Sequence, residues 1–189
     1  MGLAVCGCLA AGVSYAVLGT GTGRPPVAKG ASPDLASAQT TVDSMSAIVA
    51  VSAADRTRVI NAIDAVQSCA LTASSGQPVL ESVINDRRAG VAQLQHLAAT
   101  HAPVIRISMI NDLLTTLNAS ISDDESYMSW MDDIAAGRSA CGGNPMSDPN
   151  FAAAKAESDR TNLDKEVFVE EWNQLARSYG KPTYRPGDF

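Results

Sequence analysis

The stretch that decides the fold is ISMINDLLTTLNASISDDESYMSWMDDIA, residues 107–135, because it carries the most regular pattern in the chain. Its apolar residues fall at the a and d positions of a heptad repeat, and Asp124 alone interrupts them. The repeat is formed by Ile107, Ile110, Leu114, Leu117, Ile121, Met128, Met131 and Ala135. A period of 3.5 residues predicts a helix that packs at the shallow crossing angle of helical bundles.

Helical spacing also extends to both sides of this stretch. A first helix is predicted over 34–69, after Ser32 and Pro33 as its start signals. Its apolar stripe consists of Val42, Met45, Val49, Val59, Ile63 and Val66. The Ser/Gly-rich residues 70–77 predict a turn, and a second helix is expected from near Pro78 until the chain breaks at Ala102, before Pro103.

A fourth helix is predicted from a cap at Asp148 or Asn150 to Tyr179, where Gly180, Lys181 and Pro182 end it. Its second half carries Phe168, Trp172 and Leu175 at heptad spacing. The Ala-rich first half, 152–164, is expected to project or to pack loosely. Nothing alternates with period two for long enough to predict a strand.

These helices predict an all-α domain over residues 34–180, an antiparallel up-down four-helix bundle with coiled-coil-like packing. Short connections require each helix to run opposite to the one before it. Residues 181–189 are expected to form an extended C-terminal tail, either frayed or available as a short recognition segment.

Antiparallel helices place Cys69 and Cys141 at the same end of the bundle, which predicts a disulfide between them. One observation argues against the pair, since the second helix is expected to be shorter than the third and would leave the two cysteines at different heights. Two unpaired, buried thiols are the alternative. A disulfide would be typical of a domain exported from the cytosol.

Residues 2–21 contain no charged side chain and are long enough to cross a bilayer as a helix. We interpret residues 1–23 as a transmembrane anchor or signal segment and residues 24–33 as a linker. A cleaved signal peptide and a lipoprotein signal at Cys8 are alternatives to a retained anchor. The domain is therefore expected at the cell membrane on its extracytoplasmic side, or secreted if the segment is cleaved.

On a helix, Ala4, Cys8, Gly12 and Ala16 would form one ridge of small residues. Such ridges let transmembrane helices approach closely, so this face is a candidate packing surface in the membrane. Chance spacing in an Ala- and Gly-rich segment is the alternative explanation.

Composition excludes some functions and leaves others without support. The net charge of −6 argues against a nucleic-acid-binding surface. The two histidines, His96 and His101, are too far apart in helical register to share a metal, and no phosphate-binding loop occurs. We therefore expect no cofactor, no metal and no enzymatic activity. The acidic residues around Asp123 and Asp132 are interpreted as a solvated face, and weak binding of a divalent cation is the alternative.

Asp124 is the residue that fits the heptad pattern least, because a buried carboxylate requires a partner. We expect either that an Arg or Lys of the fourth helix pairs with it or that it marks the point where the bundle opens. If the helices pair as predicted, Met128, Trp130 and Trp172 lie near its level and form a candidate ligand pocket; core packing is the alternative use of these side chains.

These observations lead to two functional hypotheses. The first is a membrane-tethered interaction or assembly module on the outer side of a bacterial cell, whose partners are the lipid bilayer and another membrane or envelope protein. The second is a bundle that binds or senses a small ligand near Asp124. Both depend on architecture alone, which is weak support for a function.

Overall fold

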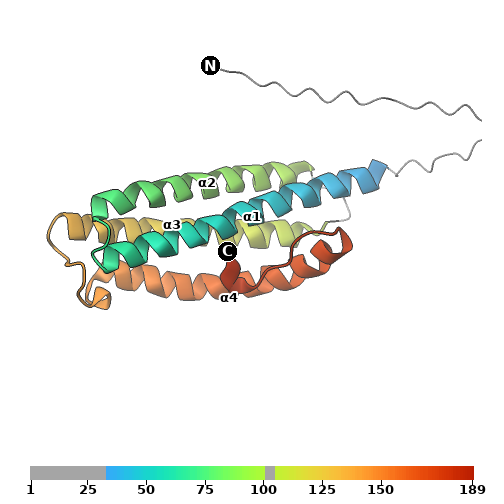
Figure 1. Cartoon of the computed structure of the whole chain (residues 1–189). Helices are drawn as coiled ribbons and strands as arrows, with labels where there is room; N and C mark the ends of the chain where they lie inside the picture. The colour runs from blue at the N-terminus through green and yellow to red at the C-terminus, as the bar shows by residue number, and fades with distance from the viewer. Residues whose placement is uncertain (1–32, 101–104) are drawn as a thin grey trace, which may run out of the picture. The chain divides into compact units, whose positions relative to one another are not determined.

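The computed structural model describes residues 33–100 and 105–189, which form four α-helices and no strand (Figure 1). The helices are α1 (Pro33–Gln67), α2 (Ala73–Thr100), α3 (Ile107–Ala135) and α4 (Pro149–Ser178). Two short 3-10 helices, η1 (Pro145–Ser147) and η2 (Pro186–Asp188), lie before α4 and near the C-terminus. Helices that follow one another pack side by side, which confirms the all-α bundle prediction.

Several sequence-based predictions lie outside the described residues. They include the membrane segment, residues 1–23, its small-residue ridge and residues 24–32 of the linker. The ridge consists of Ala4, Cys8, Gly12 and Ala16. Within the part of the chain that the structure describes, no helix combines the length and the apolar character that crossing a membrane requires.

The start of α2 corrects the predicted turn at 70–77, because the helix already begins at Ala73 and contains Pro78. Gly76 is the reason for the difference. A Cβ atom at Gly76 would lie 2.8 Å from Cγ2 of Val66 and 3.0 Å from Sδ of Met131. The glycine that indicated a turn therefore allows α2 to approach α1 and α3 closely.

The disulfide between Cys69 and Cys141 is present, with the two Cα atoms 5.3 Å apart. The expected difference in helix length does not exist, since α2 has 28 residues and α3 has 29. Next to the bond, the Gly142 amide donates a hydrogen bond of 2.7 Å to the carbonyl of Gln67. The predicted pairing is confirmed, and it joins the end of α1 to the α3–α4 loop.

The buried face of α3 differs in part from the predicted heptad face. One predicted row is buried and consists of Ile110, Leu117, Asp124 and Met131. The other row is half-buried or exposed and consists of Ile107, Leu114, Ile121, Met128 and Ala135. Buried in its place are Met109, Leu113, Thr116, Ser120, Asp123, Tyr127 and Trp130. Because α3 packs against both α2 and α4, its buried face is wide and includes polar residues.

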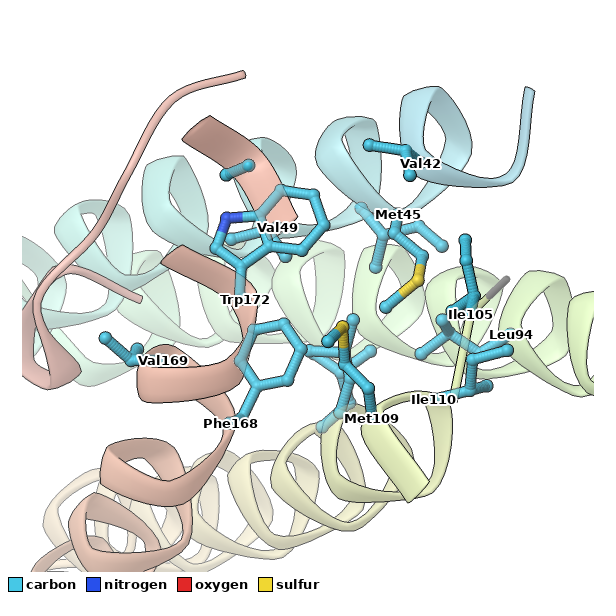
Figure 2. Close-up of a cluster of buried hydrophobic side chains, with 14 of the residues drawn as sticks. Val42, Met45, Val49, Leu94, Ile105, Met109, Ile110, Phe168, Val169 and Trp172 are labelled. Atoms are coloured by element: carbon cyan, nitrogen blue, oxygen red, sulfur yellow. The ribbon is translucent and has the colours of Figure 1, made fainter. Parts of the chain in front are cut away.

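Two apolar clusters form the core. The tail-end cluster lies near the start of α1 and the end of α4, and includes Val42, Met45, Val49, Leu94, Ile110, Leu113, Phe168, Trp172 and Phe189. Figure 2 shows Phe168 and Trp172 turned toward α1 in this cluster. The disulfide-end cluster includes Val59, Ile63, Val66, Leu80, Val83, Tyr127, Trp130, Met131 and Phe151. In the tail-end cluster, the N-terminal halves of α1 and α3 pack against the C-terminal halves of α2 and α4. In the disulfide-end cluster, the C-terminal halves of α1 and α3 pack against the N-terminal halves of α2 and α4. Successive helices therefore run antiparallel.

The first half of α4 packs more tightly than predicted. Asp148 caps the helix by accepting the amide N–H groups of Asn150 and Phe151. Phe151 meets Trp130 edge-on, with ring centroids 5.0 Å apart, and Ala154 is fully buried. The prediction that residues 152–164 project or pack loosely is therefore wrong, because Ala154 and Thr161 are buried and Phe151, just before this range, anchors its start in the disulfide-end cluster.

Residues 181–189, predicted as an extended tail, fold back over the bundle between α1 and α4 (Figure 1). The indole N–H of Trp172 donates to the carbonyl of Pro182, and the Asn173 side chain makes two hydrogen bonds to the backbone of Tyr184. Phe189 is fully buried and packs edge-on against Phe168, at 5.6 Å between ring centroids. The C-terminal segment thus completes the tail-end cluster.

Candidate functional site

A layer of buried charged residues separates the two apolar clusters. We call Asp55, Arg87, Asp123, Asp124 and Lys165 the charged layer; all five side chains are buried. Each of the four helices contributes at least one member. In each helix, that member lies between the residues that belong to one apolar cluster and those that belong to the other. The layer therefore crosses the whole bundle at a single level.

Asp124 on α3 lies beside Arg87 on α2, with 3.4 Å between Oδ2 and Nε. The sequence predicted a partner on α4, whereas the closest cation belongs to α2. Lys165 of α4 also acts on Asp124, since its charge lowers the pKa of that carboxyl. Burial has the larger effect and raises the pKa of Asp124 to about 6.

Asp123 is buried next to Asp124, which corrects its interpretation as part of a solvated acidic face. Burial, followed by repulsion from Asp124, raises the pKa of Asp123 to about 7. A hydrogen bond from Ser158 and the charge of Lys165 act in the opposite direction. The physical reason for the burial is that α4 covers this side of α3.

Lys165 is the basic residue that α4 contributes to the layer. Burial, together with the charges of Arg56 and Arg87, lowers the pKa of Lys165 to about 7. Its Nζ also lies 5.8 Å from the ring centroid of Phe189, a cation–π distance. Lys165 therefore connects the charged layer to the C-terminal segment.

A cavity of about 80 Å³ opens into the charged layer and is lined by side chains from all four helices. Four of the buried atoms that these residues contribute have no hydrogen-bond partner within the protein: Oδ1 of Asp123, Oδ2 of Asp124, and Nε of Arg56 and of Arg87. Oδ2 of Asp124 and Nε of Arg87 nevertheless form an ion pair, so Oδ1 of Asp123 and Nε of Arg56 are the unsatisfied acceptor and donor around this small polar space. Such a space suits water or a small polar ligand.

The predicted pocket residues are only partly brought together. Asp124 lines the cavity, whereas Met128, Trp130 and Trp172 do not. Trp130 belongs to the disulfide-end cluster and Trp172 to the tail-end cluster, so the charged layer lies between the two indoles. Both indole rings serve as core packing.

The chemistry available to the charged layer is proton uptake and release near neutral pH, because Asp123, Asp124 and Lys165 all have pKa values of about 6 or 7. Among the described residues, no group of three or more His, Cys, Asp or Glu side chains is arranged to hold a metal ion. His96 is exposed near the end of α2, and His101 lies outside the described residues.

Sequence reasoning found Asp124 but missed the other members of the layer. A signal was present in each helix, because Asp55, Arg87 and Lys165 each fall on the same helical stripe as buried apolar residues of their own helix. One such charge has many explanations. Charged residues on the apolar faces of three or more helices, all at the same height in the bundle, would have indicated a shared polar layer.

Comparison with known proteins leaves the function open: no family model matches the chain, no curated protein matches its sequence, and no solved structure matches its fold.

Proposed function

We propose that this chain is a non-enzymatic, membrane-tethered bundle that acts outside the cytoplasm by binding another membrane or envelope protein. The observation that carries the proposal is the Cys69–Cys141 disulfide. Such bonds persist in oxidising compartments and are rare in the cytosol. The uncharged residues 2–21 supply the tether in this proposal.

The outer surface of α4 offers a place to look for the partner. Leu163 and Val167 are 63% and 57% exposed and lie one turn apart on the same side of α4. Exposed apolar residues are common singly, so the pair serves here to position a probe.

The first experiment determines the compartment. The full chain is expressed with its native N-terminus, and membranes are washed with salt and carbonate before thiols are labelled with and without reduction. We expect the chain in the membrane pellet, with Cys69 and Cys141 labelled only after reduction. A variant lacking residues 2–21 is the control and should leave the pellet. A salt-soluble, fully labelled chain in the cytosol would contradict the proposal.

The second experiment looks for the partner directly. A photo-crosslinking amino acid replaces Leu163 or Val167 in the full chain, and exposed Ser122 on α3 is the control position. We expect one discrete crosslinked protein from the α4 positions and none from Ser122. Equal, diffuse crosslinking from all three positions would count against a specific interface.

Ligand binding in the charged cavity is the second candidate function. It is favoured by Oδ1 of Asp123, which has no hydrogen-bond partner within the protein, and by the cavity that Asp123 and Asp124 line. A ligand that binds there would release or take up protons at neutral pH, since both carboxyls have raised pKa values. Calorimetry in two buffers of different ionisation enthalpy measures that proton exchange; no exchange on binding would argue against this site.

A further inference from the structure

A second cavity lies as an open groove between α1 and α2, and Arg87 lines both this groove and the cavity in the charged layer. Its volume is about 260 Å³. Its walls and floor are mostly apolar and include Ala47, Ile48, Val51, Ala89, Gly90 and Leu117. An apolar cavity of roughly 150 Å³ is already large enough for benzene, so this groove has room for a larger hydrocarbon group.

Small residues create the groove. Ala47 of α1 and Ala89 of α2 leave its rim open, while Gly90 allows the helices to come together below. A Cβ atom at Gly90 would lie 3.3 Å from side-chain carbons of both Ile48 and Leu117. The result is a closed apolar floor under an open mouth.

One end of the groove is acidic. Asp55 is only 2% exposed and lines the groove beside Asp86. Its Oδ1 accepts a hydrogen bond of 2.9 Å from Arg58, which also donates to Asp86 and to Ser82. Oδ2 of Asp55, in contrast, has no hydrogen-bond partner within the protein. A buried carboxylate oxygen in this state favours a donor from outside.

The charge around Asp55 favours a cation over an anion. Burial and repulsion from Asp86 raise the pKa of Asp55 in spite of the charges of Arg58 and Arg87. Asp55 and Asp86 share the guanidinium of Arg58 at this end of the groove, so one cation serves two carboxylates there. Arg87 cannot easily serve an incoming anion, because its Nε faces Asp124 on the other side.

We propose that this groove binds a small amphipathic amine, with the hydrocarbon part on the floor formed by Ile48 and Leu117 and the ammonium group donating to Oδ2 of Asp55. The proposal is independent of the proposed envelope partner, since it concerns another surface and another class of ligand. A charge-assisted hydrogen bond to a buried carboxylate contributes about 1.5–3 kcal/mol, which corresponds to a preference of about tenfold or more over an uncharged head group.

The test compares three ligands of equal chain length, namely hexylammonium, hexanol and hexanoate, on the full chain in lipid nanodiscs. The measurement is the chemical shift of the Val51 and Ala89 methyl groups, because both side chains line the groove. At about pH 8 an alkylammonium keeps its proton. We expect hexylammonium to bind about tenfold more tightly than hexanol, and hexanoate not to bind. Equal affinity for the amine and the alcohol, a preference for hexanoate, or no shift at millimolar ligand would overturn the proposal.

Variants separate recognition from folding. Asp55→Asn keeps the shape but removes the charge, so the preference for hexylammonium over hexanol should disappear while hexanol affinity is unchanged. Asp86→Asn is the matched control, because Asp86 is half exposed and should affect the preference less. Ala89→Leu should weaken both ligands, whereas Ala99→Leu, at an exposed position further along α2, should affect neither. An unchanged preference in Asp55→Asn would overturn the assignment of the ammonium site.

Discussion

At one end of the bundle the Cys69–Cys141 bond joins α1 to the loop before α4, whereas at the other end residues 181–189 lie across α1 and α4 and bury Phe189. The first closure is covalent and acts mainly by restricting the unfolded chain. The second is built from side-chain packing and hydrogen bonds and acts on the folded state alone. The two ends should therefore respond differently to reduction and to mutation.

The largest effect is expected at the disulfide end. Replacing both Cys69 and Cys141 by serine removes a crosslink that spans 72 residues. The chain-entropy model predicts a loss of about 4 kcal/mol in the free energy of unfolding. Chemical denaturation measures it, and adding a reductant to the native protein is the control, which should give a similar loss. Stability that is the same with and without the bond would remove the distinction between the two ends.

Phe189→Ala tests the tail end. The ring is fully buried against Phe168, so its removal should lower the free energy of unfolding by about 3 kcal/mol. Leu163→Ala is the control, because this side chain is 63% exposed and should change stability by less than about 0.5 kcal/mol. If both variants behave alike, the C-terminal segment does not contribute to the core.

The charged layer between the ends predicts an unusual dependence of stability on pH. From the ordinary value of 3.8 up to about 7, the unfolded chain has released the Asp123 proton while the folded protein retains it, so stability falls as the pH rises. From about 7 up to 10.5, the unfolded chain keeps the Lys165 proton that the folded protein has released, so stability rises again. These groups therefore produce a stability minimum near neutral pH.

Denaturation at a series of pH values measures this minimum, whose acidic limb should amount to about 1–2 kcal/mol after solvent screening. Asp123→Asn should reduce the acidic limb, leave the part that the raised pKa of Asp124 produces, and leave the alkaline limb. Lys165→Met should do the reverse. A stability maximum near neutral pH in the unmodified protein, the ordinary behaviour, would show that the layer does not titrate as described.

The smallest effect sharpens the description of the disulfide end. Gly142 has a φ of +74°, a backbone conformation that side chains disfavour, and Gly142→Ala should reduce stability by about 1 kcal/mol. Gly143→Ala is the matched control, because Gly143 is absent from the positive-φ residues and its Cβ would make only an ordinary contact, 3.4 Å from the carbonyl oxygen of Ala140. Equal losses in the two variants would mean that the backbone at Gly142 is not constrained.

Local patterns were sufficient for several parts of the fold. Ile107–Ala135 is helical over the whole predicted range, Asp148 caps α4, and Cys69 pairs with Cys141. Each depends on neighbouring residues or on helix direction, which a sequence expresses directly. The start of α2 was predicted too late, because glycine is common in turns and Gly76 was taken to indicate one. Only the close approach to Val66 shows why a glycine is required at this position of the helix.

By itself, the sequence determined that this protein is helical, how its helices alternate in direction, and which cysteines meet, because these features follow from periodicity and short connections. Only the tertiary structure decided that Asp55, Arg87 and Lys165 share a level with Asp124, that α3 buries a wide and partly polar face, and that Phe189 enters the core. Those outcomes depend on the height and rotation of each helix against its neighbours. Packing over the whole bundle sets these quantities, and no single segment of the chain encodes them.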